Sequence, residues 1–176
     1  MQAYGGISNY FPKPLIQEIF VQNSAVNNDA EYVSIGLIYL RFRNYYKISS
    51  SESKGSSMNI TLLRFIDNCS LNYKEIRSKY ITIKEYKFTS KRKRTSIIIA
   101  LEDPKKARIL LRGVSELVLE SCSKIHKLDD EIIEITPEIK NTISEKIEEM
   151  ASRGLRTVIM AYKDFDIDSQ SIIKIK

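Results

Sequence analysis

The stretch TSIIIALEDPKKARILL, residues 95–111, predicts two β-strands joined by a tight turn. Residues 95–101 and 107–111 are rich in isoleucine, leucine and other aliphatic side chains, which suit a half-buried strand. Between them, EDPKK at residues 102–106 combines proline with two acidic and two basic residues, as turns commonly do. The stretch therefore predicts a β-hairpin.

Strand patterns continue on both sides of this hairpin. Upstream, residues 81–86 alternate apolar and polar side chains, and downstream residues 131–135 and 155–162 predict a short strand and a buried strand. Residues 31–46 are aromatic and β-branched and predict another strand, followed by a serine-rich segment that predicts a mobile loop ending near Ser57.

Other segments carry apolar residues at helical spacing. In the clearest one, Thr136 is a good N-cap, Pro137 occupies the first helical position and Gly154 ends the helix. Its apolar stripe consists of Ile139, Ile143, Ile147 and Met150. Further helices are expected over residues 13–23, from Ser56 or Ser57 to Cys69, over residues 73–80, and in a segment that Ser115 caps and that carries Cys122. Together these patterns predict an α+β fold, a mostly antiparallel β-sheet flanked by helices, in a single domain over residues 1–176.

Composition narrows the class of protein. Of the 176 residues, 43% are apolar and 28% charged, which is typical of a globular domain, and no apolar run is long enough to cross a bilayer. The first residues lack the pattern of a secretory signal, so a cytosolic chain is expected, with Cys69 and Cys122 as buried free thiols. The net charge of +6 favours an anionic partner such as nucleic acid, an anionic membrane surface or phosphate groups, unless it only keeps the surface solvated.

Several common chemistries have no support in the sequence. His126, the only histidine, is flanked by lysines and is expected to be a solvated surface residue rather than a catalytic base. The chain contains neither a GxxxxGK[ST] phosphate loop nor a GxGxxG motif. Asp164, Asp166 and Asp168 begin like a calcium loop, but the required glycine and bidentate glutamate are missing, so a solvated tail is expected.

Four stretches in order resemble successive motifs of the nucleotide-binding domain of P-type cation-transporting ATPases. They are GSSMNITLLRF from Gly55, KFTSKRKRTSIII from Lys87, LLRGVSELVLESC from Leu110 and MASRGLRTVIMAYKDF from Met150. PLIQEIFVQNSAV from Pro14 also resembles the helix that opens this domain, so the resemblance covers most of the chain. Within the superfamily the chain is most similar to plasma-membrane calcium pumps. The phospholipid flippases, which share F-x-S-x-R-K-R and GLRT, are the alternative.

The resemblance implies an ATP site. It implies that Phe88 stacks on the adenine ring and that Lys93 lies along the phosphates or the sugar, and an aromatic face with a cation five residues later suits a nucleotide on physical grounds too. Arg156 matches an arginine that reaches toward the phosphates, and Val158 matches an apolar wall of the adenine pocket. Without these motifs, ordinary core packing would be the preferred interpretation of Phe88 and Val158.

Four departures from the family pattern affect this site, and one of them is Val114 in place of alanine. Arg112 stands where the family has a lysine, and Gly113 follows it, where a glycine would allow close approach of the backbone to the base. Asn59 replaces the glutamate expected to accept from the adenine amine; its amide oxygen could still accept, but without charge. Thr95 replaces the usual methionine. We therefore expect a nucleotide site with weaker affinity and looser base selectivity.

The missing motifs limit the expected activity. The phosphorylation motif DKTGT, the TGD and GDGxND segments and any transmembrane helix are absent from this sequence, so it resembles an excised cytosolic domain that does not hydrolyse ATP alone. The resemblance implies that its partners are ATP and the phosphorylation and actuator domains of a membrane-embedded parent chain, on the cytoplasmic face of a membrane. Magnesium is expected in the parent pump and not on this domain alone, and the fragment is expected to be a monomer.

Two other classes of function stay open at this stage. KRKR at residues 91–94, with the aromatic and basic residues 39–47, could form a nucleic-acid-binding surface, although no RNA- or DNA-binding signature accompanies them. The substitution at Asn59 is also compatible with an interaction domain whose nucleotide site has decayed.

Overall fold

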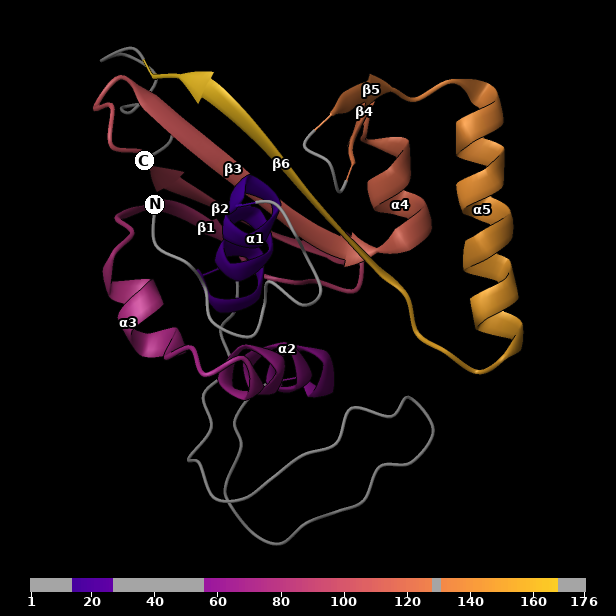
Figure 1. Ribbon diagram of the computed structural model, residues 1–176, viewed down its shortest axis with the longest axis horizontal. Coiled ribbons are helices and arrows are strands. Elements are labelled where there is room, and N and C mark those ends of the chain that lie inside the picture. The colour runs from indigo at the N-terminus through magenta and orange to yellow at the C-terminus, as the bar shows by residue number, and fades with distance from the viewer. Residues whose placement is uncertain (1–13, 27–55, 128–130, 168–176) are drawn as a thin grey trace, which may run out of the picture.

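Four antiparallel strands form the main sheet of the computed structural model, in the order β1-β2-β3-β6 (Figure 1). Their bounds are β1 Thr82–Tyr86, β2 Arg94–Ala100, β3 Lys106–Val114 and β6 Val158–Asp166. The structure describes residues 14–26, 56–127 and 131–167. Within them, the predicted α+β class with a mostly antiparallel sheet flanked by helices is confirmed.

The β2–β3 hairpin is present as predicted. Its turn is closed by the Lys106 amide, which donates to the Asp103 carbonyl oxygen at 2.9 Å. β3 continues to Val114, three residues beyond the end of its predicted strand, and pairs with β2 on one side and β6 on the other. This extension carries Arg112 and Gly113 into the sheet rather than into a loop.

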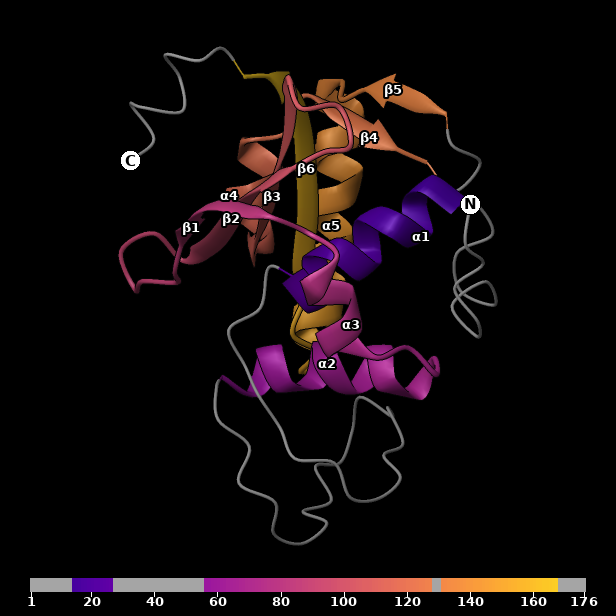
Figure 2. The same ribbon diagram turned by 90° about the vertical axis from the view of Figure 1, so that its left-hand side faces the viewer.

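Helices and one π-helical turn cover one face of the sheet (Figures 1 and 2). They are α1 (Pro14–Val21), the π-helical turn η2 (Gln22–Val26), α2 (Ser57–Asn68) and α3 (Tyr73–Ser78). The buried core that they share with the sheet contains Val21, Ala25, Val26, Leu63, Ile66, Cys69, Tyr73, Ile76, Ile97, Ile99 and Leu110. Ile97 and Ile99 alternate along β2, and Ile97 lies opposite Leu110, so these three side chains point to the same face.

The predicted helices on this face are present with small changes. The first is α-helical to Val21 and continues as a π-helix instead of ending near residue 23. Ser56 is the N-cap of α2, since its hydroxyl accepts from the Asn59 amide at 3.3 Å. Asn72 caps α3 by accepting from the amides of its first turn.

The second group of elements comprises α4 (Ser115–Glu120), the two-stranded sheet of β4 (Lys124–His126) and β5 (Ile132–Glu134), and α5 (Pro137–Ser152). α4 follows β3 directly and packs on β3 and β6, and α5 lies alongside α4 (Figure 1). Lys140 of α5 forms an ion pair with Glu120 of α4 at 2.8 Å. β5 falls within its predicted segment, whereas β4 was not predicted.

The ends of α5 agree with the sequence pattern. The Thr136 hydroxyl accepts from the Ile139 amide at 3.3 Å, and Pro137 follows at the start of the helix. Gly154 has φ 72°, in the left-handed region that favours glycine after a helix. Of the predicted apolar stripe only Ile147 is buried, and Met150 is exposed. The buried face of α5 is therefore narrower than the apolar stripe in its sequence.

Two predicted boundaries are wrong. Ser115 is not a cap: Val114 occupies the N-cap position, and the buried Ser115 hydroxyl has no hydrogen-bond partner among the residues the structure describes. The last strand runs over Val158–Asp166 instead of residues 155–162, because the chain leaving α5 first has to cross back to the sheet (Figure 1). Asp164 and Asp166 therefore belong to a strand and not to a solvated tail, and Asp168 lies outside the described residues.

The predicted strand over residues 31–46 and the serine-rich loop up to residue 55 lie outside the described residues. Cys69 is buried and Cys122 half-buried, both as free thiols, and burial raises the pKa of each thiol. Among the described helices, none combines the length and apolar character needed to span a bilayer.

Candidate functional site

One end of the sheet collects several of the residues expected at a nucleotide site. Thr95 lies opposite Arg112, and Arg112 lies opposite Met160. Two residues further along β3, Val114 lies opposite Val158. Residues directly opposite each other share a face, and every second residue along a strand returns to it. These five side chains therefore lie on one face of the sheet, which is also the face of the hydrophobic core.

Arg112 and Asn59 are brought together on this face. Arg112 is only 1% exposed. Its Nη2 donates to Asn59 Oδ1 at 2.8 Å, and its Nη1 donates to the carbonyl oxygen of Asn23 in η2 at 2.9 Å. The amide oxygen that was predicted to accept from an adenine amine thus accepts from Arg112, and the guanidinium is held inside the protein instead of projecting from its surface.

Gly113 allows a close approach, and the neighbour is the chain itself. A Cβ at this position would lie 2.6 Å from the Lys93 carbonyl oxygen and 2.7 Å from Arg94 Cβ, closer than real Cβ contacts allow. The next amide, that of Val114, donates to the Lys93 carbonyl oxygen at 3.1 Å. Glycine is therefore required here to let the loop before β2 lie on β3.

The loop between β1 and β2 presents Phe88 to solvent. Phe88 is 58% exposed, so core packing, the alternative interpretation of this residue, does not apply. Two bonds close the loop: the Lys93 amide donates to the Thr89 carbonyl oxygen at 2.7 Å, and the Arg92 amide donates to Thr89 Oγ1 at 3.1 Å. Lys93 has φ 51°, a left-handed conformation that is uncommon outside glycine.

The four cations of KRKR differ in what they contact. Arg92 donates to Ser96 Oγ at 3.2 Å and lies over the Tyr86 ring, with its guanidinium carbon 5.3 Å from the ring centre. Arg94 donates to the Ser121 hydroxyl at 3.3 Å, at the end of α4. Lys91 and Lys93 are exposed. Two of the four charges therefore hold the loop and α4 in place, which leaves a smaller basic surface than the sequence suggests.

Val158 is the first residue of β6, and Arg156 belongs to the segment just before that strand. Val158 is half-buried and begins β6, where its pairing with Val114 connects it to the residues above. Arg156 is exposed and lies two residues before β6, in the segment that returns from α5. The sheet register thus places Val158 at the site, whereas Arg156 is related to the site only by its position in the chain.

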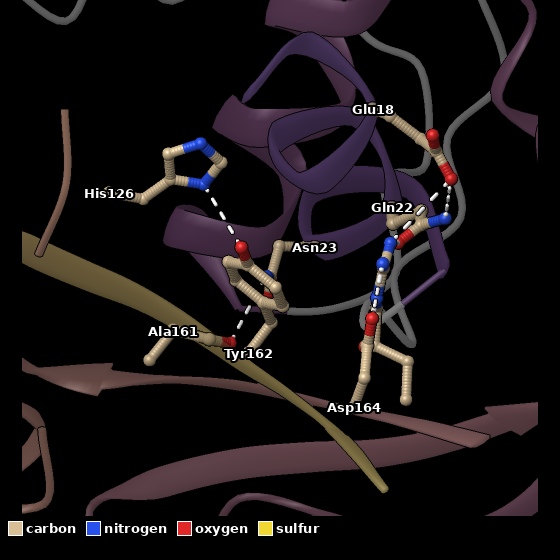
Figure 3. Close-up of polar contacts among 8 residues, drawn as sticks. Glu18, Gln22, Asn23, His126, Ala161, Tyr162 and Asp164 are labelled. Carbon is tan, nitrogen blue, oxygen red and sulfur yellow. Dashed lines mark hydrogen bonds and ion pairs between the residues drawn. The ribbon is translucent and has the colours of Figure 1, made fainter. Parts of the chain in front are cut away.

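A second buried arginine was not anticipated from the sequence. Arg108 Nε and Nη2 donate to the two carboxylate oxygens of Asp164 at 2.6 and 2.8 Å, and Nη1 donates to Gln22 Oε1 at 3.0 Å (Figure 3). Glu18 lies 3.6 Å from the same guanidinium and accepts from Gln22 Nε2 at 2.7 Å. Burial disfavours the charge of Arg108, but its hydrogen bond to Asp164 and the charges of Asp164 and Glu18 outweigh burial and raise the pKa of the guanidinium.

The same network contradicts the surface interpretation of His126. This residue is half-buried in β4, and its Nδ1 lies 3.0 Å from the Tyr162 hydroxyl, within hydrogen-bonding distance (Figure 3). The Tyr162 ring in turn lies under Arg108, 5.2 Å from the guanidinium carbon. His126 therefore joins the small sheet to the main sheet, because the unpredicted strand β4 places it next to β6.

A sequence signal for both buried arginines existed. Arg108 and Arg112 are four residues apart in an otherwise apolar strand, so both fall on the face defined by the buried Leu110 between them. A charge at such a position requires partners, and the buried polar residues Gln22 and Asn23 of η2 supply them.

Comparison with known proteins gives a consistent result. The model of the family described as P-type ATPase, cytoplasmic domain N, matches residues 18–174. The chain is 31% identical over 166 residues to calcium-transporting ATPase PAT1 of Dictyostelium discoideum, which is 91% of this chain and 13% of that protein. It is 35% identical over 115 residues to plasma membrane calcium-transporting ATPase 1 of Gallus gallus, 63% of this chain and 10% of that protein.

A third similar protein is the plasma membrane-type calcium-transporting ATPase 2 of Arabidopsis thaliana, 32% identical over 94 residues, which is 53% of this chain and 9% of that protein. The chain thus spans only a small part of the length of each of these relatives. The resemblance that rested on four short motifs is confirmed by a match over most of the chain.

Proposed function

Because this chain belongs to the family of the P-type ATPase cytoplasmic domain N, we propose that it binds ATP and positions the terminal phosphate for transfer to an aspartate on a separate domain. We propose further that the parent protein transports calcium, as the names of its relatives state for them, and that this domain lies on the cytoplasmic face of a membrane. In the transfer, a carboxylate oxygen of that aspartate would bond to the γ-phosphorus as the bond to the ADP oxygen breaks.

The observation that carries this proposal is the exposure of Phe88. Phe88 lies in the loop after β1, and its ring is 58% exposed, so it offers an apolar face that a ligand can cover. The face of an adenine ring is a suitable cover, since base stacking on aromatic side chains tolerates an exposed setting. Lys93 follows five residues later in the same closed loop, where its cation can reach the phosphates.

The other residues have distinct proposed roles. Val158 and its partner Val114 are proposed to form an apolar wall. Asn59 is assigned to the edge of the base from the family pattern alone. Gly113 acts indirectly, because it lets Lys93 lie on β3. Arg112 acts through Asn59, and Arg156 is assigned to the phosphates from the family pattern alone.

We propose that magnesium is bound in the parent protein and not by this domain alone. Magnesium prefers carboxylate and phosphate oxygens, and the described residues contain no group of three or more histidine, cysteine, aspartate or glutamate side chains that could hold a metal ion. ATP binding is proposed to depend on stacking against Phe88 and on the cation of Lys93. Transfer requires a second domain, which supplies the aspartate.

Titration of the 176-residue chain with ATP, adenosine and a single-stranded oligonucleotide tests the proposal. Phe88→Ala should raise the Kd for ATP and adenosine by roughly five- to a hundredfold, the loss expected for one stacked base. Ile132→Ala, which truncates another side chain that is 53% exposed but lies in β5, is the matched control and should leave both constants unchanged.

Lys93→Ala should raise the Kd for ATP by about three- to tenfold and leave the Kd for adenosine unchanged, because only ATP carries the phosphates. Lys91→Ala, which removes an exposed cation two residues away, is its control. Equal losses for ATP and adenosine in Lys93→Ala would contradict the phosphate role. Steeply salt-dependent oligonucleotide binding with no response to ATP would overturn the proposed function in favour of a nucleic-acid module.

A further inference from the structure

We propose that Arg92 is a positioning residue of the nucleotide site. Its side chain holds the loop between β1 and β2, residues 87–93, in its closed form, and so fixes Phe88 and Lys93 relative to each other without contacting the ligand. This inference rests on the proposed function, because it takes the roles of Phe88 and Lys93 from it. The loop joins two antiparallel strands, so its two ends lie close together.

The side chain of Arg92 contacts both ends of this loop. Its Nη1 donates to the carbonyl oxygen of Lys87 at 3.3 Å, and its Nη2 donates to Ser96 Oγ in β2 at 3.2 Å. The Lys87 carbonyl belongs to the planar peptide group whose nitrogen is that of Phe88. The guanidinium also lies over the ring of Tyr86, the last residue of β1. One side chain therefore contacts the strand before the loop, the loop itself and the strand after it.

The register of the sheet places these contacts on the face away from the other candidate site residues. Tyr86 lies opposite Ser96 on the neighbouring strand, so their side chains share one face. Thr95 precedes Ser96 in β2 and points to the other face, which is the one that carries Arg112. The Arg92 guanidinium, which contacts Tyr86 and Ser96, is thus on the opposite side of the sheet from Arg112. This separation favours an indirect role for Arg92 over contact with a ligand.

The closed loop depends on polar contacts rather than on burial. Residues 87–91 and Lys93 are exposed, whereas Arg92 is half-buried. Lys93 has φ 51°, a conformation that residues other than glycine adopt only when the surrounding structure holds it. Arg92 is therefore the loop residue that packs on the sheet. A loop that is held closed before a ligand arrives loses less entropy on binding.

The contacts of Arg92 require an arginine and not only a positive charge. The planar guanidinium carries several N–H donors in a fixed arrangement and stacks on aromatic faces, so it can donate to Lys87 and Ser96 while it lies over Tyr86. A lysine ammonium is a single nitrogen on a flexible stem and cannot meet these three groups in the same way. Arg92→Lys therefore keeps the charge of the loop and removes the shape that holds it.

Arg92→Lys and Arg92→Met test the inference by titration of the 176-residue chain with adenosine and with ATP. Both variants should raise the Kd for adenosine by about three- to tenfold, and the Kd for ATP by at least the same factor, because both ligands stack on Phe88. Lys91→Met removes the neighbouring exposed cation and is the matched control, with both constants expected to stay unchanged.

Hydrogen exchange provides a second measurement that needs no nucleotide. The amides of residues 92 and 93 donate to Thr89 in the closed loop, so they should exchange about three- to tenfold faster in Arg92→Met. The amides of β3 should keep their exchange rates, which would show that the sheet of the variant is intact.

The adenosine titration decides between the possible roles of Arg92. A Kd for adenosine that stays unchanged in both variants overturns this inference and leaves ATP binding standing. A loss for ATP alone that Arg92→Lys largely restores would do so by assigning the charge of Arg92 to the phosphates. A parent chain that binds neither nucleotide overturns the proposed function, and with it the role of Arg92 in the site.

Discussion

At the scale of single residues, Gly113 lets two parts of the backbone come close together at the candidate site. It has no side chain, and a Cβ here would lie only 2.6 Å from the Lys93 carbonyl oxygen. The same carbonyl accepts from the Val114 amide, so one oxygen fixes the last residue of the loop to β3. Lys93, the residue proposed to contact the phosphates, adopts a left-handed conformation at this point. The backbone from which its side chain extends is therefore in a defined position.

Gly113→Ala should therefore destabilise the protein. The added methyl group would lie 2.6 Å from the Lys93 carbonyl oxygen, and because the nearest atoms belong to backbone and to Arg94 Cβ, the loop has to move. We expect a loss of about 1–3 kcal/mol, as for other overpacked positions. Urea unfolding measures it, with Val114→Ala at the next, partly exposed position as the control. A variant as stable as the parent would show that the loop is not held by this contact.

Several candidate site residues could be predicted from the sequence, but the residues that they contact could not. Phe88, Lys93 and Val158 were found from short motifs, and the exposure of Phe88 agrees with a residue kept for a ligand. The partners of Arg112 could not be foreseen, because its guanidinium donates to the carbonyl oxygen of Asn23, which is 89 residues away in the chain. The geometry of a buried polar group is set by partners that local patterns do not reveal.

At the scale of secondary structure, local signals predicted elements well where the chain itself supplies the boundary. Thr136 and Pro137 start α5, and Ser56 starts α2, because capping depends on residues three or four apart. Ser115 has the same capping chemistry but failed, since β3 runs without a loop into α4 and leaves Val114 in the extended cap position. β4 was missed because three residues with one β-branched side chain carry almost no pattern.

Thr136→Ala should weaken α5 and change the titration of a neighbouring group. Loss of the cap should cost about 1 kcal/mol. A hydrogen bond from the Thr136 side chain is the largest cause that lowers the pKa of Glu138, so this pKa should rise toward its ordinary value in the variant. NMR titration of the Glu138 carboxyl measures the shift directly, and Asn141→Ser, at an exposed position within α5, is the control.

The sign of the pH effect follows from the lowered pKa. A carboxyl group whose pKa is lower in the folded state stabilises the protein above its unfolded pKa and loses this contribution as the pH falls through the folded value. The difference in stability between the parent and Thr136→Ala should therefore shrink as the pH falls from about 5 to 3. An unchanged Glu138 pKa in the variant would show that Thr136 does not interact with this carboxylate.

At the scale of the whole molecule, one buried side chain contacts both the first and the last described segments. Arg108, in the central strand β3, contacts Glu18 and Gln22 at the start of the chain and Asp164 near its end (Figure 3). The sequence separations are 86 residues to Gln22 and 56 to Asp164. The α+β class was predictable from local patterns, but this connection was not, because only the assembled sheet and η2 bring the partners together.

Asp164→Asn tests whether this connection stabilises the fold. The substitution keeps the shape of the side chain but leaves the buried guanidinium without its carboxylate, and we expect a loss of about 1–3 kcal/mol in the free energy of unfolding. This expected loss is smaller than that for a fully buried ion pair because the Asp164 side chain is 41% exposed. Asp166→Asn, at the exposed end of the same strand, is the matched control and should change stability by less than about 0.5 kcal/mol.

Two further measurements separate the ion pair from general damage to β6. In a double-mutant cycle with Arg108→Met, the loss in the double variant should be smaller than the sum of the two single losses, because the pair is removed together. The pKa of Arg108 is raised in the folded state, so its contribution is present below the unfolded pKa and is lost only as the pH rises through a still higher value. The effect of Asp164→Asn should consequently stay constant between about pH 6 and 9, where the Arg108 guanidinium keeps its charge. Additive losses in the cycle would instead mean that Arg108 and Asp164 stabilise the two ends of the chain independently.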